Sequence, residues 1–310
     1  MLEYNAPRGI SMNKLEELSE NNKENYQLYL KRMTESMKYS TKGLIPLLTK
    51  NSKNILDVGC GSGVMLKALE MENPNATLTG LDLNIDAINS LKENTNYKLY
   101  HMDFMNLKEV KFDTIIFSSI LHEISSYHND PDKRFTEKPI LEAFIKSNDL
   151  LEDGGSIIVR DGLLLPYQQG YNKVLVSFNN VEDGEWLYKF RNDFRGFDNI
   201  DINTEIIKLD SNMYLVSEGF LKEFLCKYTW GSESYPREIN ERFGILTKDE
   251  WTSLIKEAGF RIETIVESKE EYEKYLSPKI KITDKCGGYY EYPNMTIMFK
   301  ATKVKSLKKD

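Results

Sequence analysis

The sequence feature most able to bind a ligand is the segment 57–63, which reads DVGCGSG and carries a glycine at every second position from 59. Glycine has no Cβ atom, so the backbone of such a loop can turn sharply and a ligand can approach it closely. A buried strand over 54–58 is expected before the loop and a helix over 63–72 after it, and the first turn of a helix has free N–H groups. We therefore predict that a phosphate or nucleoside ligand binds at this turn.

The spacing of the glycines separates two classes of cofactor. A dinucleotide-binding loop needs a small third residue in G-x-G-x-x-G, but Val64 or Leu66 occupies that position. An acid two residues before G-x-G-x-G closely resembles motif I of the class I S-adenosylmethionine (SAM) methyltransferases. A turn without a ligand is the alternative, but it requires one glycine rather than three. The resemblance implies that SAM is the cofactor, that S-adenosylhomocysteine is the product, and that the loop residues in contact are Asp57, Gly59, Cys60, Gly61 and Gly63.

Two acids at the ends of the next expected strands extend this resemblance. Asp82 ends the second strand, where a carboxylate can accept hydrogen bonds from both ribose hydroxyls, and Leu83 follows it. Asp103 and Phe104 follow the third strand, where family members often place an acid near the adenine amino group and an apolar residue beside the ring. The alternatives are that Asp82 caps a helix over 84–94 and that Asp103 is an exposed turn acid.

Four polar residues lie at the carboxyl end of the fourth expected strand, at the edge where open α/β sheets bind ligands. We predict that Ser118 contacts SAM, that Ser119 binds the methyl acceptor, and that His122 and Glu123 are catalytic. Histidine titrates near neutral pH, so His122 can take a proton from an attacking hydroxyl or amine. The alternative for His122 is a structural or SAM-site role, because many family members carry a Leu-His pair here that does no chemistry.

Arg160 and Asp161 stand at the end of the fifth expected strand, on the same side of the sheet. We predict that Asp161 is catalytic and that Arg160 binds the acceptor. An ion pair between two such neighbouring side chains is an equally supported alternative.

The segment 166–245 departs from a minimal methyltransferase core. Aromatic residues make up 15 of its 80 positions, against 11% of the whole chain, and acids outnumber Lys and Arg. This composition indicates a folded insertion that caps the substrate rather than a basic arm for nucleic acid. We predict that Arg191, Trp230, Tyr235 and Arg237 bind the substrate, with ordinary packing as the alternative.

Composition limits the remaining possibilities. The chain of 310 residues has a net charge of -7, which gives no overall basic field for nucleic acid. Its three cysteines match no zinc spacing, and no cluster with metal-ligand spacing is visible, so we predict no metal. An apolar leader or a long apolar run is missing from the sequence, so we expect a soluble, cytoplasmic protein without membrane contact.

The expected fold is α/β, with a Rossmann-like, doubly wound sheet of seven strands, the last antiparallel. Residues 1–50 would form an N-terminal helical cap, 51–165 and 246–310 the SAM-binding core, and 166–245 the insertion after strand five. Polar segments at 125–139 and 269–294 are expected to be loops. A capping box at Thr247 and Glu250 predicts the start of the helix after the insertion. The strands are expected at 54–58, 77–82, 97–101, 112–118, 156–162, 260–268 and 295–301.

The resemblance implies a SAM-dependent methyltransferase that acts by in-line SN2 transfer. The aromatic insertion favours an oxygen or nitrogen of a small polar or aromatic metabolite as acceptor. An RNA or nucleotide acceptor is a second possibility that the acidic charge disfavours. A SAM-binding regulatory subunit without catalytic activity is a third. The oligomeric state is not indicated by the sequence.

Overall fold

The structure is a computed structural model that describes residues 37, 40–92, 96–165, 172–196, 206–231, 234–269 and 275–304. Most of the predicted N-terminal cap lies outside the described residues. What is described there consists of Met37 and two short elements, η1 (Thr41–Leu44) and α3 (Ile45–Leu48).

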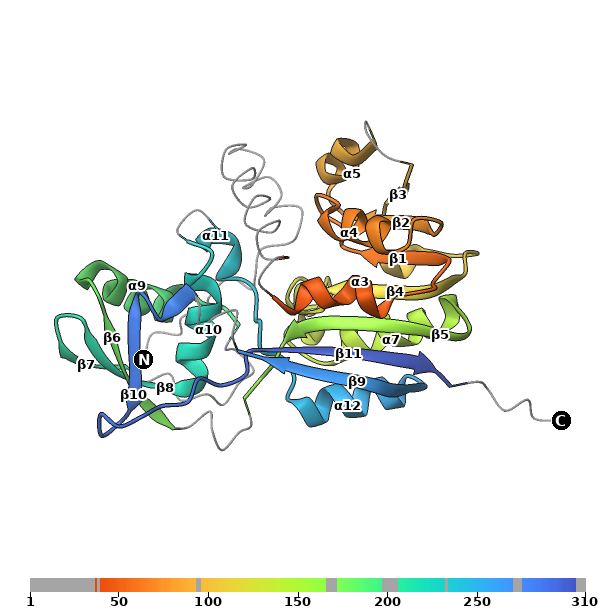
Figure 1. Cartoon of the computed structure of the whole chain (residues 1–310). Helices are drawn as coiled ribbons and strands as arrows, with labels where there is room; N and C mark the ends of the chain where they lie inside the picture. The colour runs from red at the N-terminus through yellow and green to blue at the C-terminus, as the bar shows by residue number, and fades with distance from the viewer. Residues whose placement is uncertain are drawn as a thin grey trace.

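A sheet of seven strands carries the site, in the order β3-β2-β1-β4-β5-β11-β9 (Figure 1). β11 is antiparallel to both of its neighbours, whereas β1 to β5 are parallel. The predicted Rossmann-like sheet and its antiparallel last strand are thus confirmed. The strands are β1 (Asn54–Val58), β2 (Thr77–Asp82), β3 (Lys98–His101), β4 (Phe112–Ser118), β5 (Leu151–Gly162), β9 (Phe260–Ser268) and β11 (Thr296–Lys303).

Helices cover both faces of this sheet, because successive side chains of a strand point to opposite faces. Ile116 of β4 joins one buried cluster with residues of α4 (Val64–Glu72) and α5 (Ile85–Lys92). Phe117, the next residue, joins the opposite cluster with α7 (Lys138–Leu150) and α12 (Lys248–Glu257). The two helix layers hold the central strands in place, and the candidate site lies in the loops at the carboxyl ends of these strands.

The order of the strands reverses beside β1, which pairs with β2 on one side and β4 on the other. Val58, at the end of β1, lies opposite Leu81 and Phe117 in the register. The glycine loop, the end of β2 and the end of β4 therefore meet at one edge. Open α/β sheets bind ligands at this position.

The insertion forms a second body with its own antiparallel sheet, in the order β10-β6-β8-β7. It lies beside the carboxyl-end edge of the large sheet in Figure 1. Its elements are β6 (Lys173–Phe178), α9 (Val181–Asp193), β7 (Ile206–Asp210), β8 (Met213–Ser217), α10 (Glu218–Tyr228), α11 (Tyr235–Glu238) and β10 (Ile280–Asp284).

The core of this second body is rich in aromatic rings, as the composition predicts. Phe178 contacts Tyr214, Phe224 and Tyr228 in edge-on geometry, with ring centroids 5.9–6.2 Å apart. All residues of α10 are buried. The aromatic side chains thus form a hydrophobic core, which is the packing alternative for most of them.

Two predicted loops were wrong in part. The segment 269–294 contains β10, which pairs with β6 although it lies outside 166–245. The segment 125–139 contains the end of α6 (Leu121–Ser126) and the short η3 (Pro131–Lys133). These three elements are short, so their apolar pattern is too brief to be read from the sequence. Among the described helices, none is long and apolar enough to cross a bilayer.

Candidate cofactor and acceptor site

The glycine loop adopts backbone conformations that favour glycine. Gly59, Gly61 and Gly63 have φ of 72°, 48° and 73°. A Cβ atom at Gly59 would lie 2.7 Å from the side chain of Ile120, and one at Gly63 would lie 2.5 Å from Leu91. The loop therefore packs closely against the segment after β4, while its N–H groups at 59 and 60 donate to the carbonyl of Leu81.

Asp57, just before the glycines of this loop, has a buried carboxylate with an unpaired oxygen, which indicates a bound ligand. It is 2% exposed, and its Oδ2 has no hydrogen-bond partner among the described residues. Burial and the nearby charge of Asp82 raise the pKa of Asp57 to about 8, against the opposing effect of Lys42. Asp57 and Lys42 line one pocket, whose other residues are Met37, Gly59, Cys60, Ser62, Val64, Met65 and Ser118.

This pocket fits the amino-acid end of SAM. An unpaired carboxylate oxygen suits an ammonium group, and a lysine in the same pocket suits a carboxylate. Cys60 is buried, and burial followed by the charges of Asp57 and Asp82 raises the pKa of its thiol, which therefore stays protonated. Asp57, Cys60 and Ser118, which are all predicted to contact SAM, line this one pocket, and their contact with SAM stays a prediction.

Asp82 holds the glycine loop and the next helix together. Its Oδ2 accepts from Gly61 N at 2.7 Å, and its Oδ1 accepts from Asn84 N at 2.8 Å. Asn84 caps α5, since its Oδ1 accepts from the N–H groups of Asp86 and Ala87. A carboxylate has about four acceptor positions, so two remain available for a ligand beside the exposed Leu83.

Asp103 and Phe104, which are predicted to lie near the adenine of SAM, make contacts within the protein. Phe104 is buried in the core and packs edge-on against Phe117 at 5.4 Å. Its contact with an adenine ring stays a prediction. Asp103 is exposed and caps η2 (Phe104–Asn106), accepting from Met105 N at 2.8 Å. The turn role is thus observed for Asp103, because a short helix after β3 needs a cap.

Ser119 and Arg160, both predicted to bind the acceptor, bind each other. Arg160 Nη1 donates to Ser119 Oγ at 2.6 Å, and Arg160 Nε donates to Thr41 Oγ1 at 3.3 Å. Arg160 is buried, and Ser119 has a φ of 60°. The pair fixes the turn between β4 and α6. Contact of Ser119 or Arg160 with the acceptor stays a prediction.

His122 and Asp161 form a buried pair at the tips of β4 and β5. His122 Nδ1 and Asp161 Oδ1 are 2.7 Å apart, and Asp161 also accepts from the backbone N–H groups of Leu121, His122 and Gly162. Burial opposes ionisation of both groups, but their interaction lowers the pKa of Asp161 and, together with Glu241, raises that of His122 to about 10. Neutral His122 is therefore scarce at neutral pH, which argues against its predicted role as a general base.

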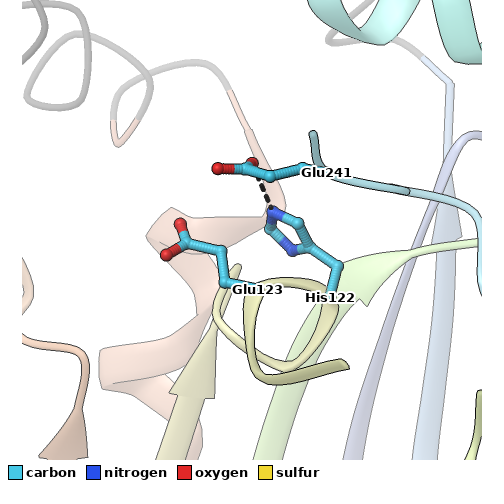
Figure 2. Close-up of side chains that lie close together, drawn as sticks. All are labelled: His122, Glu123 and Glu241. Carbon is cyan, nitrogen blue, oxygen red and sulfur yellow. Dashed lines mark ion pairs between the residues drawn. The ribbon is translucent and has the colours of Figure 1, made fainter. Parts of the chain in front are cut away.

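Glu241 binds the second nitrogen of this imidazole, and sequence reasoning missed it. His122 Nε2 lies 3.5 Å from Glu241 Oε2. Figure 2 marks this ion pair with a dashed line. Tyr127 Oη and Arg237 Nε donate to Glu241 Oε1 at 2.9 and 3.0 Å. Burial would raise the pKa of Glu241, but Arg237 and His122 lower it to about 2. A glutamate four residues after Arg237 reads as a surface ion pair, so the sequence offered no signal for it.

Glu123 completes this group, which we call the carboxylate cluster: His122, Glu123, Arg237 and Glu241. Arg237 Nη2 donates to Glu123 Oε1 at 2.6 Å, so one guanidinium bridges both glutamates. Ligand atoms of His122, Glu123 and Glu241 lie within 4.8 Å of one another, a donor set that can hold a metal. Arg237 already supplies a cation to both glutamates, however, and the cluster needs no metal for its neutralisation.

The other residues predicted to bind the substrate are Arg191, Trp230 and Tyr235, and they do not belong to the carboxylate cluster. Tyr235 stacks on Trp186 at 5.4 Å and donates to Asp193 Oδ2 at 2.9 Å. Arg191 is exposed on α9, and Trp230 is partly buried after α10. Arg237 thus contacts Glu123 of the large-sheet body, whereas Tyr235 contacts other residues of the insertion.

The sequence comparison identifies the family of this fold. Residues 49–259 match a family model described as a methyltransferase domain. The "Bifunctional methyltransferase" of Rickettsia prowazekii (strain Madrid E) is 25% identical over 256 residues, which cover 74% of this chain and 49% of that protein. The "Ribosomal RNA small subunit methyltransferase C" of Shewanella amazonensis is 30% identical over 145 residues, 45% of this chain and 40% of that protein. The chain thus spans about half the length, or less, of these relatives.

Solved methyltransferase structures also align with the chain. One is the N-methyltransferase NodS from Bradyrhizobium japonicum in complex with S-adenosyl-L-homocysteine. Its alignment covers 87% of this chain and 87% of the NodS chain, with a TM-score of 0.44 and 11% sequence identity. Human N-acetylserotonin methyltransferase in complex with SAM covers 90% of this chain and 55% of its own at 0.47 and 13%. The family assignment rests on the sequence match over 49–259.

Proposed function

We propose that this chain, which belongs to the methyltransferase-domain family, transfers a methyl group to an oxygen or nitrogen atom of a small polar or aromatic metabolite. The observation that carries the proposal is the carboxylate cluster, in which Arg237 and Glu241 of the insertion contact His122 and Glu123 of the core. The insertion therefore supplies polar side chains to the edge of the sheet beside the donor pocket. A polar site to which the core and the insertion both contribute charged side chains suits a small acceptor better than a long, charged polymer.

The donor side of the site belongs to the glycine loop. SAM, the cofactor of this family, supplies a methyl group that is already activated by the sulfonium charge. Asp57 offers its unpaired Oδ2 to an ammonium group, and Lys42 in the same pocket offers positive charge to a carboxylate. Asp82 offers its remaining acceptor positions to ribose hydroxyls.

The carboxylate cluster forms the acceptor side of the proposed site, and Asp161, Ser119 and Arg160 hold it in place. Asp161 holds the imidazole of His122, which in turn faces Glu241, while Ser119 and Arg160 fix the turn that carries them. Positioning of an acceptor in line with the methyl group is worth roughly 7–11 kcal/mol of the barrier. We therefore assign positioning roles to His122 and Asp161, and contact with the acceptor to Glu123 and Arg237.

A transfer screen tests this proposal. The full chain is incubated with SAM that carries a labelled methyl group and, separately, with the small-molecule and RNA fractions of a cell extract. We expect label in a small molecule and none in RNA. Label in RNA alone would contradict the proposed acceptor class.

An RNA acceptor is the second candidate, because a relative is named a ribosomal RNA methyltransferase. The net charge of -7 opposes it, since RNA binding depends on the release of counterions by basic residues. A regulatory subunit that binds SAM without methyl transfer is the third candidate. SAM binding together with no transfer to either fraction would support that third candidate.

A further inference from the structure

The segment 241–244 carries Glu241 to His122, yet it forms neither a helix nor a strand. Its backbone N–H groups therefore need partners outside regular secondary structure. Two of its side chains contact the imidazole of His122. Glu241 Oε2 lies 3.5 Å from Nε2, and the ring centroid of Phe243 lies 4.4 Å from that of the imidazole. The surroundings of His122 thus depend on the groups that fix this segment.

A buried carboxylate of the insertion binds the backbone of this segment. Glu223 lies on α10 and is 3% exposed. Its Oε1 accepts from the N–H group of Gly244 at 2.5 Å, and its Oε2 accepts from that of Phe243 at 3.1 Å. Two consecutive N–H groups thus bind one carboxylate, with one oxygen each. A glutamine could not replace it, because one end of an amide side chain is itself a donor.

Lys227 keeps the carboxylate of Glu223 ionised. Its Nζ donates to Glu223 Oε2 at 3.0 Å, one turn further along α10, and both side chains are buried. Burial alone would raise the pKa of Glu223, but Lys227 and the two backbone N–H groups lower it. The ammonium group of Lys227 also lies over the ring of Phe243, 5.7 Å from its centroid. The ion pair therefore contacts the segment through both its backbone and a side chain.

The large-sheet body holds the same segment from its other end. The N–H group of Arg242 donates to Ser126 Oγ at 3.0 Å, and Arg242 Nη1 donates to the carbonyl of Phe135 at 3.3 Å. Arg242 Nε donates to the carbonyl of Gly244 at 3.0 Å, which closes the segment on itself. The segment is thus fixed between the two bodies, and Glu223 is a contact that the insertion contributes.

We propose that Glu223 is a positioning residue for the acceptor site, which holds the segment 241–244 so that Glu241 meets His122. This inference rests on the proposed function, because the segment supplies the acceptor side of that site. Glu223 acts through the backbone of the segment rather than on the reacting atoms. The effect on transfer can still be large, since a misplacement of about 1 Å at a reacting site can cost on the order of 100-fold in rate.

Two variants release the segment in different ways. Glu223→Gln alone would leave the ammonium group of Lys227 buried without its partner, which destabilises a fold strongly. The first variant is therefore Glu223→Gln/Lys227→Met, which removes both charges and keeps two long side chains. The second is Gly244→Ala, which keeps both charges. Its Cβ atom would lie 3.0 Å from Glu223 Oε1 and 3.4 Å from the carbonyl oxygen of Leu163, so the segment must move.

The titration of His122 reports the position of Glu241. NMR spectra of the full chain labelled with 15N-histidine follow its three histidines, and the spectrum of His122→Gln assigns the signal. Burial lowers the pKa of His122, but Asp161 and Glu241 raise it to about 10 in the wild type. We expect this pKa to fall by about 1 or more in both variants, because the carboxylate of Glu241 moves away from the imidazole.

Tyr290→Phe is the matched control for a loss of stability in the insertion. It removes a hydrogen bond to Glu218 on the same helix and leaves the contacts of Glu223 in place. We expect a lower Tm in this control and an unchanged pKa of His122. The proposal is overturned by an unchanged pKa of His122 in either of the two variants that folds, or by an equal fall in Tyr290→Phe.

A kinetic measurement connects Glu223 to methyl transfer. With the acceptor found in the transfer screen, we expect kcat/KM to fall about tenfold or more in both variants, while the Kd for SAM changes by less than about twofold. An unchanged kcat/KM in a variant with a lowered pKa of His122 would overturn the role of Glu223 in the acceptor site. The titration itself needs no acceptor, so its result judges the position of the segment even where the proposed acceptor class fails.

Discussion

The carboxyl group of Asp57 is buried beside the glycine loop, and its pKa of about 8 lies far above the ordinary 3.8. A raised pKa means that the folded state prefers the protonated form. The associated stability is therefore present below about pH 4 and is lost as the pH rises toward 8. An unpaired buried carboxylate thus weakens the fold at the pH where it is ready to bind a cation.

Asp57→Asn should separate these two effects. Without SAM at pH 8, we expect the free energy of unfolding to rise by about 1–3 kcal/mol, because an unpaired buried charge is removed. We expect the Kd for SAM to rise about tenfold or more, since a charge-assisted hydrogen bond is lost. Denaturant unfolding and calorimetry measure the two values. The exposed Asp86→Asn is the control, and a loss of stability in Asp57→Asn with unchanged SAM affinity would contradict the assignment.

The His122–Asp161 pair predicts a second dependence on pH. The pKa of His122 is raised from 6.5 to about 10, so its contribution to stability is complete below about pH 6.5 and is lost as the pH rises through 10. The pKa of Asp161 is lowered, so its contribution is present above about 3.8 and is lost as the pH falls below that value. We expect the Tm of the wild type to fall more steeply from pH 7 to 10 than that of His122→Gln. Parallel Tm profiles would show that the imidazole is not held as a cation.

Some site residues were predictable because strand ends converge in this fold. Asp57, Asp82, His122 and Asp161 all follow from the pattern of strands and glycines, and the structure places them at one edge. Glu241 was not predictable, because its contact with His122 depends on the path by which the insertion returns to the core. A charged residue in an irregular segment reads as exposed unless the tertiary structure is known.

At the scale of elements, the approach of β5 to residue 243 decides whether the cluster forms. A Cβ atom at Gly162 would lie 2.1 Å from the carbonyl oxygen of Phe243, which is backbone and cannot move freely. The ring of Phe243 lies 4.4 Å from that of His122. A shift of this segment would therefore move Glu241 away from the imidazole.

Gly162→Ala tests this coupling between strand and segment. We expect a loss of about 1–3 kcal/mol in the free energy of unfolding from overpacking, together with a larger loss of methyl transfer than of SAM affinity. Glu152→Ala, at the opposite part of β5, is the control, because Glu152 is exposed. Equal transfer rates in the two variants would show that the segment does not position the cluster.

The elements that the sequence predicted best have strong local signals. The capping box of α12 is present, with Thr247 accepting from Glu250 N and Glu250 accepting from Thr247 N. The helix after the glycine loop begins at Val64, with Gly63 as its cap. β10 lacks such a signal, since its pairing with β6 joins residues about a hundred positions apart and only tertiary packing stabilises it.

At the scale of the molecule, two bodies with separate hydrophobic cores share one functional edge. The large sheet supplies the glycine loop, Asp82 and the pair of His122 and Asp161, and the insertion supplies Arg237 and Glu241. Such a division explains how one cofactor site serves many acceptors in a family, because the insertion can vary while the sheet stays constant. The specificity of this chain is therefore expected to lie in the contacts between the bodies.

The most direct test of this account measures SAM binding by calorimetry in the wild type, in Asp82→Ala and in the exposed control Asp86→Ala. We predict one site per chain in the wild type, an unchanged affinity in Asp86→Ala, and an affinity about ten- to 100-fold lower in Asp82→Ala, the effect of losing charge-assisted hydrogen bonds. An equal affinity of Asp82→Ala and the wild type would contradict the claim that the methyl donor binds across the glycine loop and the end of β2.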